Sequence, residues 1–315
     1  MSGNSKRRFR FAVSAIPAGT TAAGWRELAV RAEAFGYSTL NVPDHAVGQD
    51  ISVFSALATA AACTTTLRVA GLVFCNEYRH PLMLAKEVAT LDMLSGGRVE
   101  CGLGVGYGTA DFNALGIVAD GFATRIERLE ESVRILKAAF SGAPVNFSGR
   151  YYKVDNVTIL PQPARKPHPP IIIGGAGEKI MRAAGRHADI VSINERKSAT
   201  AALGMPKSPS LAEIRQIVGW LREEAGPRFD DIEIAVAAMA VMVTNDPYGI
   251  STGILPDLPA LLARARDAIR ALVGSREQIV DILQERRETL GVSYWSVPQT
   301  AMEAFAPIVA RLADT

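Results

Sequence analysis

The chain has 315 residues, of which 48% are apolar and 21% charged, and its net charge is +2. This composition is typical of a globular protein with a large core, and so small a charge does not predict nucleic acid or another polyanion as a partner. No apolar stretch reaches the roughly 18 residues that a membrane span needs, and the N-terminal residues lack the apolar core of a signal peptide, so we expect a cytoplasmic protein.

Strand-like and helix-like segments alternate from the N-terminus onward. The first predicted strand is 9–15, and the apolar spacing of the helix that follows ends at Gly36, a residue suited to a helix C-terminus. The second strand, 40–42, is stopped by Pro43, which has no N–H for a sheet. An alanine-rich helix is predicted over about 52–62.

The pattern continues through the middle of the chain. Residues 67–74 form an almost continuous apolar run, as expected of a strand covered on both faces, and Pro81 opens the next helix. Residues 98–106 are the fourth predicted strand. The helix after it has an apolar face that runs from Phe122 to Phe140.

Four more strands complete the series, at 169–175, 189–193, 231–243 and 292–297. Ser275 and Gln278 form a capping box at the start of the helix before the last strand, and Gly291 ends that helix. A terminal helix is predicted over about 300–313.

Eight strands that alternate with helices predict an α/β fold of the (β/α)8 TIM-barrel type. A doubly wound sheet usually stops near six strands and is the weaker alternative. We expect one barrel domain over 1–315, with insertions at about 143–169, 194–210 and 244–260. The first insertion resembles a hairpin with a proline-rich return. The other two follow strands at the end where barrel active sites form, and they are interpreted either as lids or as irregular crossovers.

Three strand ends carry residues that suit a binding site. The second strand is followed by Asp44 and His45, which are either a solvated turn or an acid–base pair facing a cofactor. Two glycine-rich turns follow the fourth and fifth strands, and their backbone amides are suited to hold a phosphate. The predicted cofactor-binding residues of these turns are Gly106, Tyr107, Gly108, Gly174, Gly175, Ala176 and Gly177.

Other kinds of catalytic site find little support in the sequence. The four histidines are far apart and in no zinc-binding motif, so no metal site is predicted, and no G-x-S-x-G motif is present. Cys63, Cys75 and Cys101 lack a C-x-x-C spacing and are expected to be reduced core residues, although Cys75 ends a strand and a nucleophilic role is the alternative. An acid–base pair beside a phosphate site suits an enzyme whose cofactor does the chemistry.

Two segments resemble a known family. "EYRHPLMLAKEVATLDMLSGGRVECGLGVGYG" (77–108) and "IIIGGAGEKIMRAAGRHADIVS" (171–192) are similar to the bacterial luciferase-like family of TIM barrels. The resemblance implies one of two cofactors. One branch of the family uses reduced FMN and oxygen as a two-component monooxygenase fed by a separate flavin reductase. The other branch uses the deazaflavin coenzyme F420 for hydride transfer.

The Asp-His pair resembles the F420 branch, as in F420-dependent glucose-6-phosphate dehydrogenases. The resemblance places Asp44 and His45 beside the reactive edge of the deazaflavin, with His45 assisting proton movement. Those dehydrogenases have a catalytic glutamate where this chain has Thr109, which argues against a sugar-phosphate substrate. We therefore expect an F420-dependent oxidoreductase acting on a small organic substrate. The alternatives are an FMN-dependent monooxygenase and a non-catalytic flavin-binding barrel.

The resemblance also implies a cis peptide bond that supports the cofactor ring at the end of the third strand. By position this bond is Gly71–Leu72 or Leu72–Val73, so Gly71 and Leu72 are predicted to contact the cofactor. Family barrels mostly pair, which predicts a homodimer.

Five further side chains have two interpretations each. Tyr107 and Trp295 are either pocket walls or barrel packing, and His80 more plausibly supports a loop than contacts substrate. Arg182 and Arg186 are spaced on one helix face, where they either bind an anionic cofactor tail or belong to a solvated surface.

Overall fold

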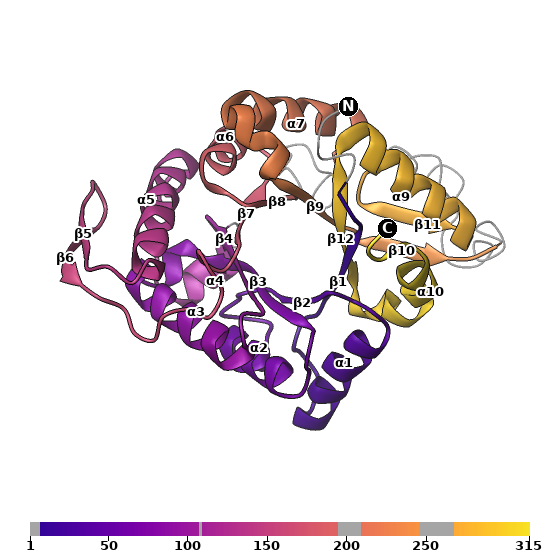
Figure 1. Cartoon of the computed structure of the whole chain (residues 1–315), viewed down its shortest axis with the longest axis horizontal. Helices are drawn as coiled ribbons and strands as arrows, with labels where there is room; N and C mark the ends of the chain where they lie inside the picture. Colours follow the sequence, from indigo (N-terminus) through magenta and orange to yellow (C-terminus); the bar gives the residue numbers. More distant parts are fainter. Residues whose placement is uncertain (1–6, 107–108, 195–208, 246–267) are drawn as a thin grey trace.

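The computed structural model describes residues 7–106, 109–194, 209–245 and 268–315. Eight parallel strands close into a barrel in the order β1-β12-β9-β8-β7-β4-β3-β2, with helices packed around it (Figure 1). The predicted TIM barrel is therefore confirmed.

The barrel strands are β1 (Arg10–Ser14), β2 (Thr39–Val42), β3 (Arg68–Cys75), β4 (Val99–Gly104), β7 (Ile171–Gly175), β8 (Ile190–Ile193), β9 (Glu233–Ala237) and β12 (Val292–Pro298). The α-helices of the described residues are α1 (Ala22–Ala34), α2 (Val53–Ala62), α3 (Pro81–Ser95), α4 (Thr109–Ala114), α5 (Phe122–Phe140), α6 (Glu178–His187), α7 (Leu211–Ala225), α9 (Arg276–Leu290) and α10 (Met302–Leu312). Short 3-10 helices are η2 (Asn76–Tyr78), η4 (Gly226–Asp231) and η5 (Gln299–Ala301).

The predicted helix ends have the expected local chemistry. Gly36 has φ +81° after α1, Pro81 opens α3 behind the capping residue His80, and Ser275 and Gln278 form a complete capping box on α9. The hairpin predicted near 143–169 is present as β5 (Val145–Ser148) and β6 (Lys153–Val157), an antiparallel pair beside α5. Most of the other two insertions lies outside the described residues.

The seventh predicted strand, 231–243, is wrong as a single element. Only β9 belongs to the barrel, whereas β10 (Ala240–Val243) leaves it and pairs with β11 (Ala271–Gly274), a strand that the sequence did not predict. The cause of the separation is a residue distant in sequence. Arg270 Nε donates to the Ala237 carbonyl at 2.7 Å, and the Arg270 carbonyl accepts from the amides of Met239 and Ala240.

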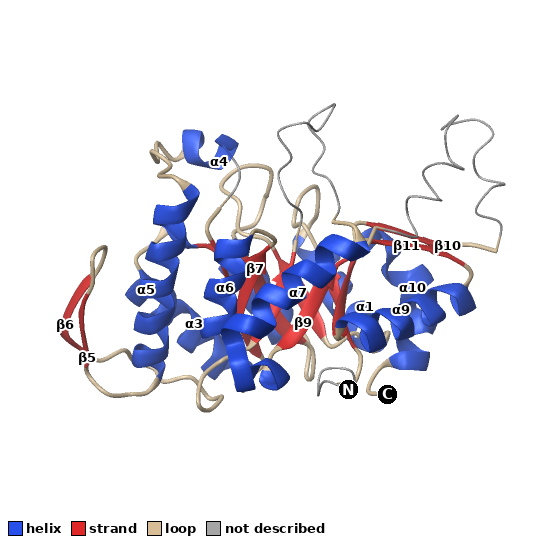
Figure 2. Cartoon of the chain, turned by 90° about the horizontal axis from the view of Figure 1, so that it is seen from above, coloured by secondary structure: helices blue, strands red, loops and turns tan. Residues whose placement is uncertain are grey.

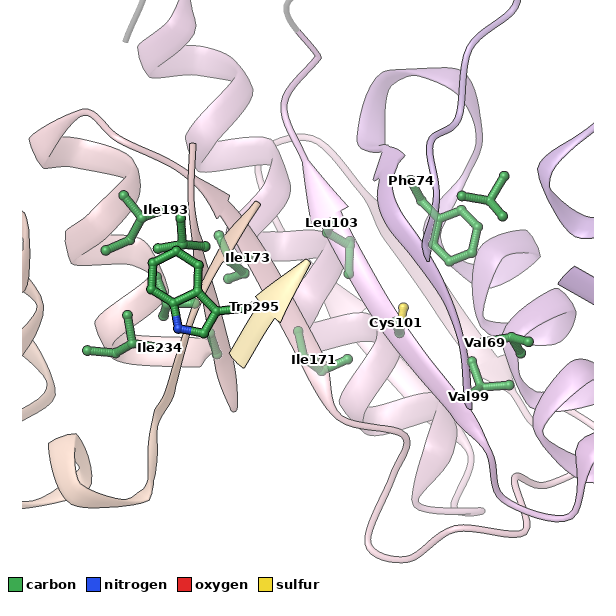
Figure 3. Close-up of a cluster of buried hydrophobic side chains, with 14 of the residues drawn as sticks. Val69, Phe74, Val99, Cys101, Leu103, Ile171, Ile173, Ile193, Ile234 and Trp295 are labelled. Atoms are coloured by element: carbon green, nitrogen blue, oxygen red, sulfur yellow. The ribbon is translucent and has the colours of Figure 1, made fainter. Parts of the chain in front are cut away.

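The strand residues alternate between two packed layers. One set points outward against the helices and includes Val69, Phe74, Val99, Cys101 and Leu103, as Figure 3 shows. Trp295 is fully buried and belongs to the same layer, as do Ile173, Ile193 and Ile234 of β7, β8 and β9 (Figure 3). The opposite set fills the barrel interior and includes Ala12, Ile172, Ile190, Ala235 and Tyr294.

The floor of the barrel, where the strands begin, is closed by charged side chains. Arg10 is bonded to Glu100, and its other guanidinium nitrogen donates to Glu233 at 2.6 Å. Tyr294 donates to Glu100 at 3.2 Å, and Arg68 lies 3.7 Å from the same carboxylate. These groups come from β1, β3, β4, β9 and β12, so one ionic cluster, here called the floor cluster, joins five strands of the barrel.

Candidate functional site

The carboxyl ends of the barrel strands form the mouth of the barrel, opposite the floor. Figure 2 shows α4 above this end of the molecule, with the C-terminus at the other end. The described connections after β2, β3 and β4 meet here, and the predicted residues Asp44 and His45 lie on the first of them. Because active sites of TIM barrels form at this end, the side chains that meet here are the candidate functional site.

Asp44 is held by an arginine that follows β3. Arg79 donates to both carboxylate oxygens of Asp44, at 2.7 and 3.1 Å, and the Cys75 amide donates to the carboxylate at 3.1 Å. Burial by itself lowers the pKa of Arg79, but the hydrogen bonds and charge of Asp44 reverse the direction and raise it. The two parallel hydrogen bonds fix the connection after β2 to the end of η2.

His45 contacts a different carboxylate. Its Nδ1 lies 2.9 Å from Oδ2 of Asp111 on α4, and the other oxygen of Asp111 accepts the amides of Ala46 and Val47 at 2.7 and 3.0 Å. Burial alone raises the pKa of Asp111, but these hydrogen bonds together lower it. The Asp111 side chain is 5% exposed and that of His45 31% exposed. A buried carboxylate thus orients an imidazole that reaches the mouth.

The interpretation of Asp44 and His45 as one acid–base pair needs correction. The two side chains are adjacent in sequence but turn to different partners, Arg79 and Asp111. The carboxylate that orients His45 comes from α4, a helix that the sequence did not predict. Asp111 stands two residues after Thr109, and no spacing rule connects it with His45, so sequence reasoning missed it.

Two arginines on α5 hold the connection after β4. Arg125 donates to the carbonyls of Val105 and Gly106, both at 2.7 Å, while Arg128 is bonded to Glu77 and to Asp120. Arg125 is 5% exposed, its guanidinium lies 4.2 Å from the centre of the Phe122 ring, and its Nε has no hydrogen-bond partner. Among the described residues it has no carboxylate partner, so a buried cation borders the glycine-rich turn.

Three glycines of the two predicted phosphate turns have close neighbours within the protein itself. Gly106 has φ +68°, and a Cβ there would lie 2.8 Å from Cys75 Sγ. A Cβ at Gly174 would lie 2.9 Å from Asn194 Nδ2, and one at Gly175 would lie 2.6 Å from Ile180. Gly177 is different, since a Cβ there would meet open space.

The second turn also ends where a helix begins. Gly177 is the N-cap of α6, no side chain caps the helix, and Ala176 is buried beneath the turn. The dipole of α6 therefore favours an anion here, although Glu178 stands in the first turn. The phosphate role of Gly106 and of 174–177 stays a prediction, and Tyr107 and Gly108 lie outside the described residues.

The predicted cis bond is present at the second of its two expected positions, Leu72–Val73. The pairing of β3 with β4 shifts its register in the same place, between Gly71 and Phe74. Leu72 packs against the interior cluster of the barrel, whereas a Cβ at Gly71 would meet the Phe74 ring. The side chain of Leu72 therefore faces the barrel interior, where a bound ring would meet it.

Several other candidates have structural roles. The buried side chain of Trp295 packs between sheet and helices and forms no pocket wall, and His80 Nδ1 accepts from the Leu82 amide at the start of α3. Burial raises the pKa of the Cys75 thiol to about 11, which argues against a nucleophile. Arg182 and Arg186 pair with glutamates of α5, α6 and α7, which leaves little reason to assign them to an anionic tail.

No group of three histidine, cysteine or acidic side chains in the described ranges could hold a metal ion. In the same ranges, no helix combines the length and the hydropathy that crossing a bilayer requires.

Comparison with known proteins gives consistent results. The family model described as luciferase-like monooxygenase matches residues 9–247. An F420-dependent glucose-6-phosphate dehydrogenase of Nakamurella multipartita is 30% identical over 66% of this chain and 60% of its own length. An FMNH(2)-dependent dimethylsulfone monooxygenase of Pseudomonas putida is 30% identical over 41% of this chain and 35% of its own. The matches thus span less than two thirds of these curated relatives.

The fold comparison agrees with the barrel topology. The solved structure of the coenzyme F420 dependent tetrahydromethanopterin reductase from Methanopyrus kandleri aligns over 97% of this chain and 100% of its own, with a TM-score of 0.76. The two sequences are 19% identical, so this likeness shows the fold alone.

Proposed function

The chain belongs to the luciferase-like monooxygenase family, and on that premise we propose that it is an oxidoreductase using coenzyme F420. It transfers a hydride between the deazaflavin and a small organic substrate. The observation that favours F420 over FMN is the extent of similarity: the F420-dependent dehydrogenase matches 66% of the chain, and the FMN-dependent monooxygenase matches 41%.

The residues at the mouth fit a phosphate-bearing cofactor. Arg125 is buried, has no carboxylate partner among the described residues and has an unpaired Nε, and burying a cation in this way is costly unless an anion approaches it. The N-terminus of α6 supplies a second site that favours negative charge. Both F420 and FMN carry a phosphate group on the chain attached to their ring, so Arg125 joins the glycine-rich turns as a proposed phosphate contact.

The protein's own part in the reaction is the movement of a proton. The cofactor, when bound, supplies the hydride chemistry, and the oxygen of an alcohol or carbonyl substrate must lose or gain a proton in the same conversion. His45 is proposed to do this at Nε2, because Asp111 binds its Nδ1 and so fixes the ring orientation and the tautomer. Asp44, bound by Arg79, keeps the end of β2 in place and borders the ring.

The alternative is a monooxygenase that uses reduced FMN and oxygen. The similarity to the dimethylsulfone monooxygenase favours it, and it requires a separate flavin reductase as a partner. A barrel that binds a flavin without catalysis is the third possibility. A cytoplasmic homodimer remains our proposal for the state of the protein.

Side-by-side calorimetric titration with F420 and FMN, each oxidised and reduced, tests the proposal. We expect micromolar binding of F420, at least about tenfold tighter than FMN, and weaker binding of both cofactors by Arg125→Met. Arg182→Met, which removes a surface arginine, is the matched control and should bind normally. Tighter binding of reduced FMN transfers the assignment to the monooxygenase, and absence of binding contradicts both enzymes.

His45→Asn separates the enzymes from the non-catalytic barrel. If the protein catalyses F420-linked reduction or oxidation of alcohols, ketones, imines or activated alkenes, this variant should keep cofactor binding and lose about 100-fold or more of the turnover rate. Unchanged turnover in the variant contradicts the proposed role of His45.

A further inference from the structure

Three polar side chains lie inside the barrel just below the mouth. Ser14 of β1 and Ser296 of β12 share a hydrogen bond of 2.7 Å, and Asn41 Nδ2 donates to the Ser296 hydroxyl at 3.1 Å. Their inward direction follows from the alternation of the strands, since Arg10 and Tyr294, respectively four and two residues earlier, meet Glu100 across the floor. We call Ser14, Asn41 and Ser296 the polar triad.

Asn41 is incompletely paired in this triad. It is 2% exposed, and its Oδ1 has no hydrogen-bond partner. Its Nδ2 carries two hydrogens, of which the Ser296 bond uses one. A buried acceptor without a partner costs free energy, and an apolar residue of the same size would avoid that cost. The bond to Ser296 accounts for Nδ2 only, so the structure gives no role to Oδ1.

We propose that Asn41 recognises the imide edge of the ring bound in the mouth. An imide presents a carbonyl, an N–H and a second carbonyl in a row. Asn41 offers complementary groups, with Oδ1 as the acceptor for the N–H and the second Nδ2 hydrogen as a donor to one carbonyl. The pyrimidinedione ring of F420 and of FMN has this edge. The inference rests on the proposed function and adds the residue that hydrogen-bonds to the ring.

The position of Asn41 agrees with this role. It is paired in register with Ser14 on one side and Ala70 on the other, and its neighbour Val42 is paired with Gly71, next to the Leu72–Val73 bond. Asp44 and His45 follow three and four residues later on the same connection. The residue proposed to hold the imide edge of the ring and the residue proposed to move the proton therefore come from the same short segment of the chain.

The test compares each cofactor with its analogue methylated at the imide nitrogen. Wild-type protein should bind the parent F420, or FMN, about tenfold or more tightly than the methylated analogue, because the methyl group removes the only donor that Oδ1 can use. Asn41→Leu should bind the parent about tenfold more weakly than wild type and should bind both ligands within about twofold. Asn146→Leu, a change in the exposed hairpin, is the matched control and should behave as wild type.

The outcomes separate the two proposals. If wild type binds the parent cofactor and its methylated analogue equally well, or if Asn41→Leu still discriminates between them, the role of Asn41 is overturned while the proposed function stands. If wild type binds neither F420 nor FMN, both are overturned. The comparison of ligands on wild-type protein needs no variant, so even with a poorly folded Asn41→Leu, equal binding of the two ligands overturns the role of Asn41.

Discussion

The two ends of the barrel both contain buried charged groups, but they use them differently. At the floor, Arg10, Glu100, Glu233 and Tyr294 contact one another and join strands. At the mouth, the side-chain bonds join connections rather than strands: Arg79 holds Asp44, and Asp111 holds His45.

The difference lies in what the mouth and the floor cluster leave unpaired. The buried atoms without a hydrogen-bond partner at the mouth include Asn41 Oδ1 and Arg125 Nε, whereas no side-chain atom of the floor cluster is in that condition. A buried polar group without a partner reduces stability, and a ligand that pairs with it recovers that loss. The comparison therefore assigns stability to the floor and binding to the mouth.

The largest expected effect is a loss of stability at the floor. Arg10→Ala leaves Glu100 and Glu233 buried without the cation that bridges them, and we expect the free energy of unfolding to fall by about 3–5 kcal/mol. Urea denaturation measures the change. Arg31→Ala, which breaks a surface pair with Glu303, is the control and should cost at most about 1 kcal/mol. Equal losses for the two variants would contradict the assigned role of the floor.

Arg79→Ala should affect both properties at the mouth. We expect a loss of about 2–4 kcal/mol in the free energy of unfolding, because Asp44 is left buried without the arginine that binds it, together with weaker cofactor binding. Adding Asp44→Asn should recover part of the stability. Arg10→Ala, measured under conditions where it is folded, should bind cofactor normally. Normal cofactor binding by Arg79→Ala would remove the distinction between the two ends.

Acid should remove the stabilisation that the carboxylate of Glu33 provides. Glu33 lies on the last turn of α1, near the start of β3. Burial by itself raises the pKa of Glu33, but hydrogen bonds from Thr65, Thr66 and Leu67 lower it to about 2. Because the folded pKa lies below the unfolded value, the stabilisation is complete above about pH 4.5 and is lost as the pH falls towards 2.

Glu33→Gln makes this pH dependence measurable. At pH 7 the variant should be less stable by roughly 2 kcal/mol, and the difference from wild type should shrink as the pH falls through that range. Denaturation at several pH values gives the curve. A difference that stays constant with pH would show that the charge of Glu33 is not what the three amides require.

The smallest effect concerns the orientation of His45. Asp111→Asn keeps the size of the side chain but weakens its bonds to the ring and to two amides, so we expect a roughly tenfold lower turnover rate with little change in cofactor affinity. Asp120→Asn, which alters the same connection through Arg128, is the control and should retain the rate. Equal rates for the two variants would show that Asp111 has no part in positioning His45.

The sequence predicted the barrel because local signals agreed with one another. Proline at 43 and 81, glycine at 36 and 291 and the capping box at Ser275 marked the ends of elements, and the apolar patterns between them had the right periods. The seventh strand was misjudged because the apolar run 231–243 contains no local break. The interruption comes from Arg270, which is 33 residues from Ala237 in the sequence.

The sequence by itself determined the order of the elements, the end of the barrel at which a site forms and the presence of Asp44 and His45 at that end. Only the tertiary structure decided which groups they meet. The bond between His45 and Asp111 spans 66 residues, and that between Asn41 and Ser296 spans 255. Closing the barrel brings such distant residues into contact, and no local pattern records contacts that depend on how the whole chain folds.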